Sequence, residues 1–339
     1  MPMHPPSAAF LALLAGCLPR YSALPPIGPE QLWAPLPVSH VQVPLPDGLV
    51  VDIAMIDSWG GAASGPGADL PPVVLVHGLS SYMGFWEHQV QALAQDRRVL
   101  ALDLPGFGAS GKPDAPYTPP WYADVLWAWL DALQVPEAVL VGHSMGGQIS
   151  ITASLSHPER VDRLVLSAPA GIETFQKGAA DWMKDYWHEE RATHAREEEL
   201  RATFEGLVFN RKDEGVERML EERVRMAATP SFRGTSVAVS RAVAGMLDHP
   251  VAARLGEVQV PTLLIFGTDD RMIPNPVFNG GRTRAVAEAG RDAIPGAQLV
   301  LLPGAGHTVH HDDPQGFNEA VRSFLREPRP RRALPTGPR

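Results

Sequence analysis

The sequence of 339 residues contains a single cysteine, so no disulfide can form within the chain. It has no run of eighteen or more apolar residues, and we therefore expect no membrane-spanning helix. Basic residues are fewer than acidic ones, 29 against 38, and the formal net charge is -9. Because proteins that bind the phosphate backbone usually carry a basic excess, we expect no nucleic-acid partner. Pro and Gly have no regular period that would indicate repeats.

Apolar residues are plentiful, at 45% of the chain, which is enough for one large domain or two small ones. Two alternating segments flank the turn Pro46-Asp47-Gly48 and predict a hairpin. Later segments such as Val73–Val76 are continuously apolar, as expected of strands buried on both faces of a parallel sheet. The predicted strands are residues 41–45, 49–56, 73–76, 98–102, 138–141, 161–167, 262–266 and 298–302.

Helical segments alternate with these strands over most of the chain, at residues 84–95, 120–134, 144–156 and 314–326. The alternation predicts βαβ units and an α/β fold with a mostly parallel, doubly wound sheet. Residues 172–258 interrupt it, because they are strongly charged and helix-prone and contain no buried-strand run. We therefore predict a helical cap inserted between strands 6 and 7, which divides the sheet domain into residues 38–171 and 259–326. Residues 327–339, rich in Pro and Arg, are expected to form a disordered tail.

The pentapeptide Gly142-His143-Ser144-Met145-Gly146 lies between the predicted strand 138–141 and a predicted helix. A Gly-x-Ser-x-Gly segment in that context is typical of a nucleophile elbow, a sharp turn that lifts the serine Oγ out of the sheet. The glycines provide the space that such a turn needs. We therefore predict that Ser144 is a catalytic nucleophile. The alternative is a small-residue turn packed against a helix.

A serine hydroxyl is a weak nucleophile until a base takes its proton. His307 is the predicted base, because it follows the last apolar strand through a Gly-Ala-Gly segment and so lies at the carboxyl end of the sheet. His310 and His311 are nearby rivals that we expect to be solvated surface residues. The acid is expected after the preceding strand, where Asp269 and Asp270 are both candidates.

Taken in order, these segments resemble the α/β-hydrolase superfamily over residues 40–326. In that family the acid follows the nucleophile in the chain and precedes the histidine. The segment from Gly267 to Pro274 is similar to the family's Gly-x-x-Asp-x-x-x-Pro pattern, and this alignment selects Asp270 as the acid. The resemblance implies that Asp270 orients His307 and stabilises its imidazolium form.

The resemblance also implies an oxyanion hole made of the backbone N–H groups of Leu79 and Met145. Leu79 belongs to His77-Gly78-Leu79-Ser80, which is similar to the family's His-Gly-x signature. In this segment His77 is expected to have a structural role. Phe85 and Trp86 follow the loop closely and are predicted to line the substrate pocket.

Residues 103–110 contain an acid, a serine and several glycines, and they also match a family segment. Asp103 is interpreted as a residue that braces its own loop by accepting main-chain hydrogen bonds. The glycines lack the spacing and the context of a dinucleotide fingerprint. We therefore expect no cofactor and no metal ion.

Within the superfamily, the sequence resembles capped bacterial lipases, esterases and monoacylglycerol-lipase-like enzymes. A serine at position 144 argues against dehalogenases and epoxide hydrolases, which carry an Asp there. We expect a carboxylic ester hydrolase (EC 3.1.1) that cleaves small-molecule or lipid esters of hydrophobic acyl groups through an acyl-enzyme on Ser144. The alternatives are C–C bond hydrolysis, perhydrolysis or amide cleavage by the same triad, and a non-catalytic binding protein. About half of the following apolar cap residues are expected to line the pocket: Trp182, Met183, Tyr186, Trp187, Phe204, Leu207, Val208, Phe209 and Met226.

The beginning of the chain resembles the signal of a bacterial lipoprotein. A short apolar segment, Ser7–Leu14, ends in a lipobox-like Leu-Ala-Gly before Cys17. The resemblance implies a signal peptide over residues 1–16, lipidation of Cys17 and a Pro-rich tether over residues 17–37. The expected location is the periplasmic side of the cell envelope, with the outer membrane favoured because Leu18 is not an Asp. Because no Lys or Arg precedes the apolar segment, a cytoplasmic enzyme with a disordered start is the alternative.

Overall fold

The computed structural model describes residues 24–62, 64–193 and 197–328. The predicted signal peptide, the predicted lipidation site Cys17 and most of the tail 327–339 lie outside the described residues. Within the described part of the chain, no helix combines the length and the apolar character needed to cross a membrane.

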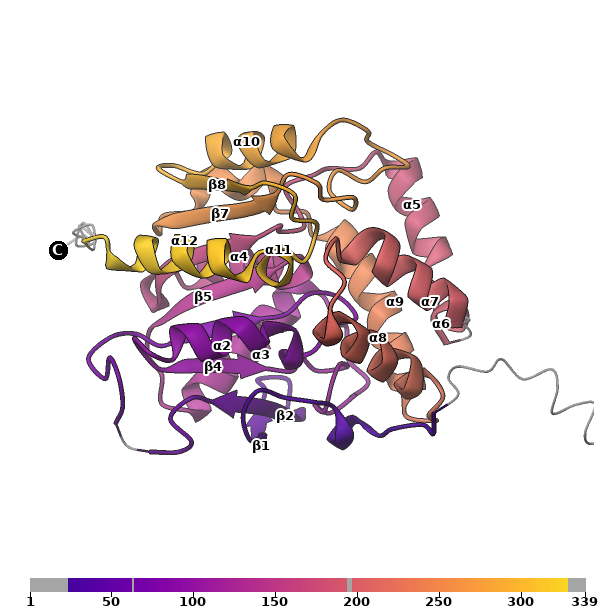
Figure 1. The fold of residues 1–339 in the computed structure, drawn as a ribbon, viewed down its shortest axis with the longest axis horizontal. Helices are drawn as coiled ribbons and strands as arrows, with labels where there is room; N and C mark the ends of the chain where they lie inside the picture. The colour runs from indigo at the N-terminus through magenta and orange to yellow at the C-terminus, as the bar shows by residue number, and fades with distance from the viewer. Residues whose placement is uncertain (1–23, 63, 194–196, 329–339) are drawn as a thin grey trace, which may run out of the picture.

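One sheet of eight strands forms the centre of the molecule, in the order β1-β2-β4-β3-β5-β6-β7-β8 (Figure 1). The strands are β1 (Ser39–Pro44), β2 (Val50–Asp57), β3 (Val73–Val76), β4 (Val99–Leu102), β5 (Ala138–His143), β6 (Val161–Ser167), β7 (Thr262–Gly267) and β8 (Gln298–Leu302). The β1–β2 and β2–β4 pairs are antiparallel, and the pairs from β4 to β8 are parallel. The predicted mostly parallel sheet is therefore confirmed, and every residue of β3 to β7 is buried, as continuous apolar runs require.

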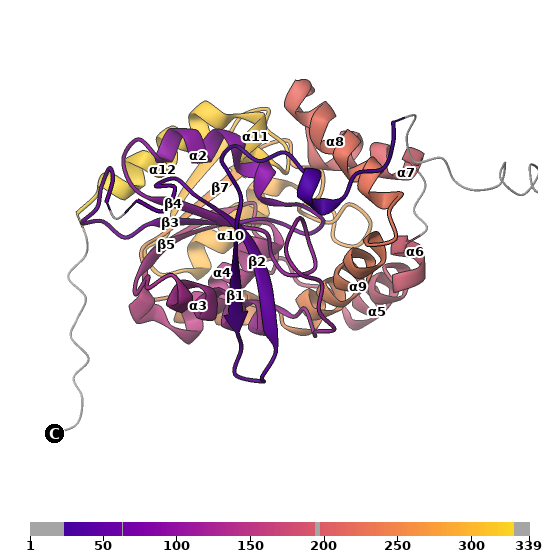
Figure 2. The ribbon, with the colours of Figure 1, turned by 90° about the horizontal axis from the view of Figure 1, so that it is seen from below.

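Helices cover both faces of this sheet, each over its own apolar core. Figure 2 shows α2 (Glu87–Leu93) and α12 (Pro314–Arg326) on one side and α3 (Pro119–Ala132) on the other. The core of the first side contains Trp86, Val90 and Phe317. On the second side, α4 (Met145–Ser156) and α10 (Thr283–Ala293) join α3 over a larger core. The sheet is thus doubly wound, as predicted.

A block of helices follows β6 and precedes β7, at the place where the sequence predicts an insertion (Figure 1). It consists of α5 (Lys177–Tyr186), α6 (Glu189–Thr193), α7 (Glu197–Thr203), η4 (Phe204–Val208), α8 (Glu214–Ala227), α9 (Phe232–Asp248) and η5 (Ala252–Glu257). These helices lie beyond the carboxyl ends of the strands, where α/β folds bind ligands. The described part of the chain also contains four short helical elements, namely η1 (Pro29–Gln31), η2 (Met83–Trp86), η3 (Pro158–Arg160) and α11 (Val309–Asp312).

Candidate active site

The turn from β5 into α4 presents Ser144 at the carboxyl end of the sheet. Ser144 has φ 52° and ψ -117°, a strained conformation for a residue with a side chain. A Cβ on Gly142 would lie 2.3 Å from the carbonyl oxygen of Gly146, and a Cβ on Gly146 would lie 2.2 Å from that of Val76. Both positions therefore require glycine, and the tight turn that results is the elbow predicted from the pentapeptide.

His307 and Asp270 form a buried pair on neighbouring loops. His307 Nδ1 lies 2.9 Å from Asp270 Oδ2, and the other carboxylate oxygen accepts the N–H groups of Met272 (2.7 Å) and Ile273 (3.0 Å). Because Nδ1–H donates to the carboxylate, the second ring nitrogen, Nε2, is left as a base. The side chain of Asp269 instead accepts a hydrogen bond from Thr268 Oγ1 (2.8 Å) in an exposed loop.

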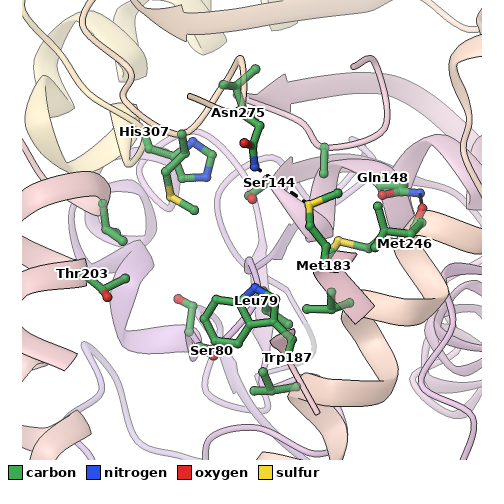
Figure 3. Close-up of a pocket in the computed structure, with 18 of the residues that line it drawn as sticks. Leu79, Ser80, Ser144, Gln148, Met183, Trp187, Thr203, Met246, Asn275 and His307 are labelled. Carbon is green, nitrogen blue, oxygen red and sulfur yellow. Dashed lines mark hydrogen bonds between the residues drawn. The ribbon is translucent and has the colours of Figure 1, made fainter. Parts of the chain in front are cut away.

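Ser144, His307 and Leu79 line one cavity of about 630 Å³ between the sheet and the helical insertion. Figure 3 shows Ser144 and His307 directed into the same part of it. Met145 is the first residue of α4, so its N–H group has no partner within the helix. The residues predicted for the triad and the oxyanion hole are thus brought together at one site.

Buried histidines surround this site and hold its loops in place. His143 Nε2 donates to the backbone oxygen of His307 (3.1 Å), and burial holds the pKa of His143 well below its usual value. His77 accepts the N–H of Leu104 at Nε2 (2.9 Å) and donates from Nδ1 to the oxygen of Gly78 (2.7 Å). Burial lowers the pKa of His77 to about 4. His77 is thus neutral and structural, as the sequence indicates, whereas the positioning role of His143 was not predicted.

The surface positions predicted for His310 and His311 are wrong. Both side chains are fully buried, because α11 packs against α2, η2 and α12. His310 stacks on Trp86, with ring centroids 4.1 Å apart, and burial lowers its pKa strongly. His311 lies 3.2 Å from a carboxylate oxygen of Asp213.

Phe85 lines the cavity, but Trp86 does not, so the prediction for Trp86 is wrong. Both belong to the 3₁₀ helix η2, where successive side chains point in different directions. Trp86 has no exposed surface and packs in the core against His310 and Phe317. Asp103 has the predicted bracing role, since its carboxylate accepts the N–H groups of Met83 (2.6 Å) and Ala109 (2.7 Å).

The helical insertion provides much of the cavity wall. Among the predicted residues, five line it: Met183, Tyr186, Trp187, Phe204 and Val208. Of the others, Trp182 is 51% exposed, and Phe209 is buried against Phe85. Gln148 and Asn275 also line the cavity and were not predicted (Figure 3). The Gln148 amide donates hydrogen bonds to the backbone oxygens of Met246 (3.0 Å) and His249 (2.9 Å). No sequence motif predicts these two bonds.

In the part of the chain that the structure describes, one group of side chains has the composition of a metal site: Glu87, His88 and His311. Its ligand atoms already have partners, because Glu87 pairs with Arg218 (2.5 Å) and His311 Nε2 lies 3.2 Å from a carboxylate oxygen of Asp213. The group therefore belongs to a network of polar contacts between the insertion and α2.

The model of the alpha/beta hydrolase fold family matches residues 71–314. A 2-hydroxymuconate semialdehyde hydrolase of Pseudomonas sp. strain CF600 is 31% identical over 265 residues, which are 76% of this chain and 87% of that protein. The chain spans 68% and 65% of the length of two 1-acylglycerol-3-phosphate O-acyltransferase relatives, a probable one from Oryza sativa and one from Arabidopsis thaliana, each 26% identical to it.

Two solved structures extend this comparison. A probable hydrolytic enzyme from Pseudomonas aeruginosa PAO1 has a TM-score of 0.79 and 25% identity, covering 90% of this chain and 100% of that chain. A thermophilic esterase from Thermogutta terrifontis has a TM-score of 0.66 and 25% identity, covering 85% and 98%. The fold predicted from the sequence is confirmed by these likenesses.

Proposed function

This chain belongs to the alpha/beta hydrolase fold family, and we propose that it cleaves carboxylic esters of hydrophobic acyl groups through an acyl-enzyme on Ser144. The observation that carries the proposal is the buried pair of His307 and Asp270 on the cavity that Ser144 also lines. A side chain held as a base at a strained serine has little use in a binding protein.

In the proposed reaction Ser144 Oγ attacks the ester carbonyl while His307 Nε2 takes the hydroxyl proton. Asp270 accepts the Nδ1–H of His307 and stabilises the imidazolium that forms. As the bond to the leaving alcohol breaks, His307 returns the proton to the alcohol oxygen. Water then attacks the acyl-enzyme by the same route, with His307 again as the base, and the carboxylic acid leaves.

The negative oxygen of the tetrahedral intermediate is held by the N–H groups of Leu79 and Met145. Both groups are fixed before the substrate arrives, one at the loop after β3 and the other at the first residue of α4. Fixed donors of this kind stabilise developing charge without reorganisation, and the loss of one typically costs about 10²–10³ in kcat.

The cavity wall supports an apolar acyl group. Leu79, Phe85, Met183 and Trp187 lie along it, and its volume of about 630 Å³ is suited to a ligand of moderate size. The likeness to a solved esterase of Thermogutta terrifontis supports an ester as the substrate.

Carbon–carbon bond hydrolysis is a second candidate, because a relative at 31% identity is a 2-hydroxymuconate semialdehyde hydrolase. The same serine, histidine and acid serve both reactions. Parallel assays with p-nitrophenyl esters and with a vinylogous 1,5-diketone separate them, since the preferred class gives the higher kcat/KM.

Labelling with a fluorophosphonate probe tests the nucleophile. We expect wild type to be labelled and Ser144→Ala to remain unlabelled. Equal labelling of the two proteins, or none of either, would contradict the proposal. A series of p-nitrophenyl esters of increasing chain length then reports the preferred acyl group.

The location in the cell envelope is part of the proposal and rests on the lipobox-like segment before Cys17. Metabolic labelling with a fatty-acid analogue should mark wild type and spare Cys17→Ala. An unlabelled wild type found in the cytoplasmic fraction would overturn the anchor and leave the hydrolase proposal untouched.

A further inference from the structure

Arg223 of α8 lines the substrate cavity with no counter-charge. Among the residues that the structure describes, it makes no ion pair, and its enclosed Nε has no hydrogen-bond partner. Its guanidinium lies over the ring of Phe232, 4.5 Å from the ring centre. Burial lowers the pKa of Arg223 to about 10, with no neighbouring charge opposing the shift, so the group is still charged at neutral pH.

Other arginines near the cavity differ from Arg223 because they have partners. Arg191 also lines the cavity, but its side chain is exposed, donates to the hydroxyl of Tyr186 (2.6 Å) and lies over the same ring. Arg218, one turn earlier on α8, binds Glu87. Arg223 is partly buried. A charge withdrawn from water usually costs stability unless it is paired or binds a ligand, so this unpaired guanidinium on a cavity wall is suited to bind an anion.

Two hydroxyl groups beside Arg223 are also unsatisfied. Ser81 and Thr235 are 5% and 3% exposed, and the hydroxyl oxygen of each lacks a hydrogen-bond partner among the described residues. Together with Arg223 they line a small recess of about 20 Å³, and Ser81, Phe85 and Arg223 line the main cavity as well. Two of these unpartnered groups, Arg223 and Ser81, therefore lie on the wall of the main cavity, and Ser81 follows Leu79, the proposed oxyanion donor, by two residues in the chain.

We propose that Arg223, with Ser81, binds a carboxylate carried by the substrate of the proposed hydrolase. The inference rests on that function and narrows its substrates to esters with a hydrophobic stretch and one anionic end. A carboxylate matches the planar guanidinium and its single positive charge. A phosphate monoester carries about -1.5 to -2 charges at neutral pH, which one arginine would leave uncompensated in a cavity that Glu173 and Glu199 also line.

A matched substrate series tests the anionic end. Mono-p-nitrophenyl esters of dicarboxylic acids from glutarate to suberate are compared with p-nitrophenyl esters of the same chain length without the carboxylate. A second arm uses 4-acyloxybenzoates, which carry the carboxylate on the leaving group, and so reports on which side of the ester Arg223 lies. We expect a higher kcat/KM for the anionic member in one arm.

Substitutions of Arg223 test whether this preference depends on its side chain. Arg223→Gln should lower the ratio of anionic to neutral kcat/KM by on the order of 30-fold, and Arg223→Lys, which keeps the charge, by less. Arg225→Gln, a change on the same helix at a residue that binds the backbone oxygen of Pro25, should keep the wild-type ratio. Equal rates for both members in both arms, or a preference that survives Arg223→Gln, would overturn the proposal. A preference for acyl phosphomonoesters over the carboxylates would overturn it as well.

Binding measurements separate this proposal from the hydrolase function. Calorimetric titration of Ser144→Ala with mono-p-nitrophenyl adipate should give heat that is lost in Ser144→Ala/Arg223→Gln. Binding without any Ser144-dependent turnover by wild type would refute the hydrolase and keep the anion site. Ser144-dependent turnover with no preference for the anionic substrate would support the hydrolase function and refute the anion site. Since Arg223 has no anionic partner to leave unpaired, and a glutamine can still pack on the ring of Phe232, Arg223→Gln should not lower the melting temperature, whereas an arginine with a structural role would lower it.

Discussion

At the scale of single residues, the neighbouring carboxylates of Asp269 and Asp270 have different surroundings. Asp270 is buried and shared between His307 and two backbone N–H groups, whereas Asp269 binds a threonine in an exposed loop. Two adjacent residues of the same type therefore have different roles. Substitution of one can be compared with the same substitution of the other as a control.

Asp270→Asn should lower kcat by on the order of 10⁴ with little change in KM, because an amide no longer fixes the productive tautomer of His307. Asp269→Asn keeps the loop and the pair intact and should retain wild-type kcat. Ester hydrolysis by the two purified variants is the measurement. A large loss in Asp269→Asn with an active Asp270→Asn would reverse the assignment of the acid.

Gly146→Ala should disrupt the elbow, because the added Cβ would lie 2.2 Å from the backbone oxygen of Val76, and neither backbone segment is free to move. We expect a lower melting temperature together with the loss of fluorophosphonate labelling. Gly178→Ala is the matched control, since a Cβ there meets nothing within 4 Å and lies in α5. It should leave labelling unchanged and hold or raise the melting temperature. A fully labelled Gly146→Ala would show that the turn tolerates a side chain.

The role of a residue could be predicted from the sequence where the backbone conformation demands a particular residue type or position. Where the role depends only on how side chains pack in three dimensions, it could not be predicted. Ser144 could be identified because the tight turn around it requires glycines, and His307 could be identified because it follows the last strand. Phe85 and Trp86 are both aromatic and are adjacent in the chain. They differ only in the direction of the side chain, which puts Phe85 on the cavity wall and Trp86 in the core. Arg223 is one of several arginines in a charged helix, and its lack of a partner is visible only in three dimensions.

At the scale of elements, α8 connects the helical insertion to the sheet domain. Arg218 binds Glu87 at the start of α2 and lies 4.0 Å from the ring centre of Trp33, in the segment before β1. Glu222, on the same helix, accepts the N–H of Trp33 (2.9 Å). A helix that is otherwise strongly charged is thus held over the cavity by contacts to two distant parts of the chain.

Arg218→Ala should lower the free energy of unfolding by about 1–3 kcal/mol, because it leaves the mostly buried carboxylate of Glu87 without its cation. Urea denaturation of Arg218→Ala, Glu87→Gln and the double variant gives the coupling between them. We expect the double variant to lose less stability than the two single losses added together. Arg254→Ala, in an exposed pair with Glu257, serves as the control and should change little. Strict additivity in the cycle would show that the pair does not couple the insertion to α2.

The strands could be predicted because strands buried on both faces read as unbroken apolar runs. The insertion could be located because such runs are missing from it. Its internal arrangement could not, since an apolar residue that faces a cavity and one that faces a neighbouring helix obey the same periodicity. Met183 lines the cavity and Met219, on α8, is core, and nothing local in the sequence distinguishes them.

At the scale of the whole molecule, the protein buries several histidines in their neutral form. His77, His143 and His310 have pKa values held below the usual range by burial. Such a histidine binds a proton more readily in the unfolded chain, so its contribution to stability is present above about pH 6.5 and is lost as the pH falls. Asp103 acts in the opposite direction, because burial raises its pKa to about 6 and the folded state gains stability as that carboxyl is protonated.

The pH dependence of unfolding isolates the part due to His77. With a pKa of about 4 in the folded state, His77 should make the free energy of unfolding about 2 kcal/mol lower at pH 5 than at pH 8. In His77→Gln the amide replaces the imidazole, with an oxygen to accept the N–H of Leu104 and an NH₂ group to reach Gly78, and it does not titrate. The stability of wild type minus that of His77→Gln should therefore fall by about 2 kcal/mol as the pH falls from 8 to 5, whatever its value at pH 8. Asp103 and His310 are common to both proteins and their contributions cancel in that difference, while His143 adds a minor part because the charge of His77 is the smallest of the causes that lower its pKa. Urea denaturation at the two pH values measures it, and a difference that stays constant would mean that folding does not lower the pKa of His77.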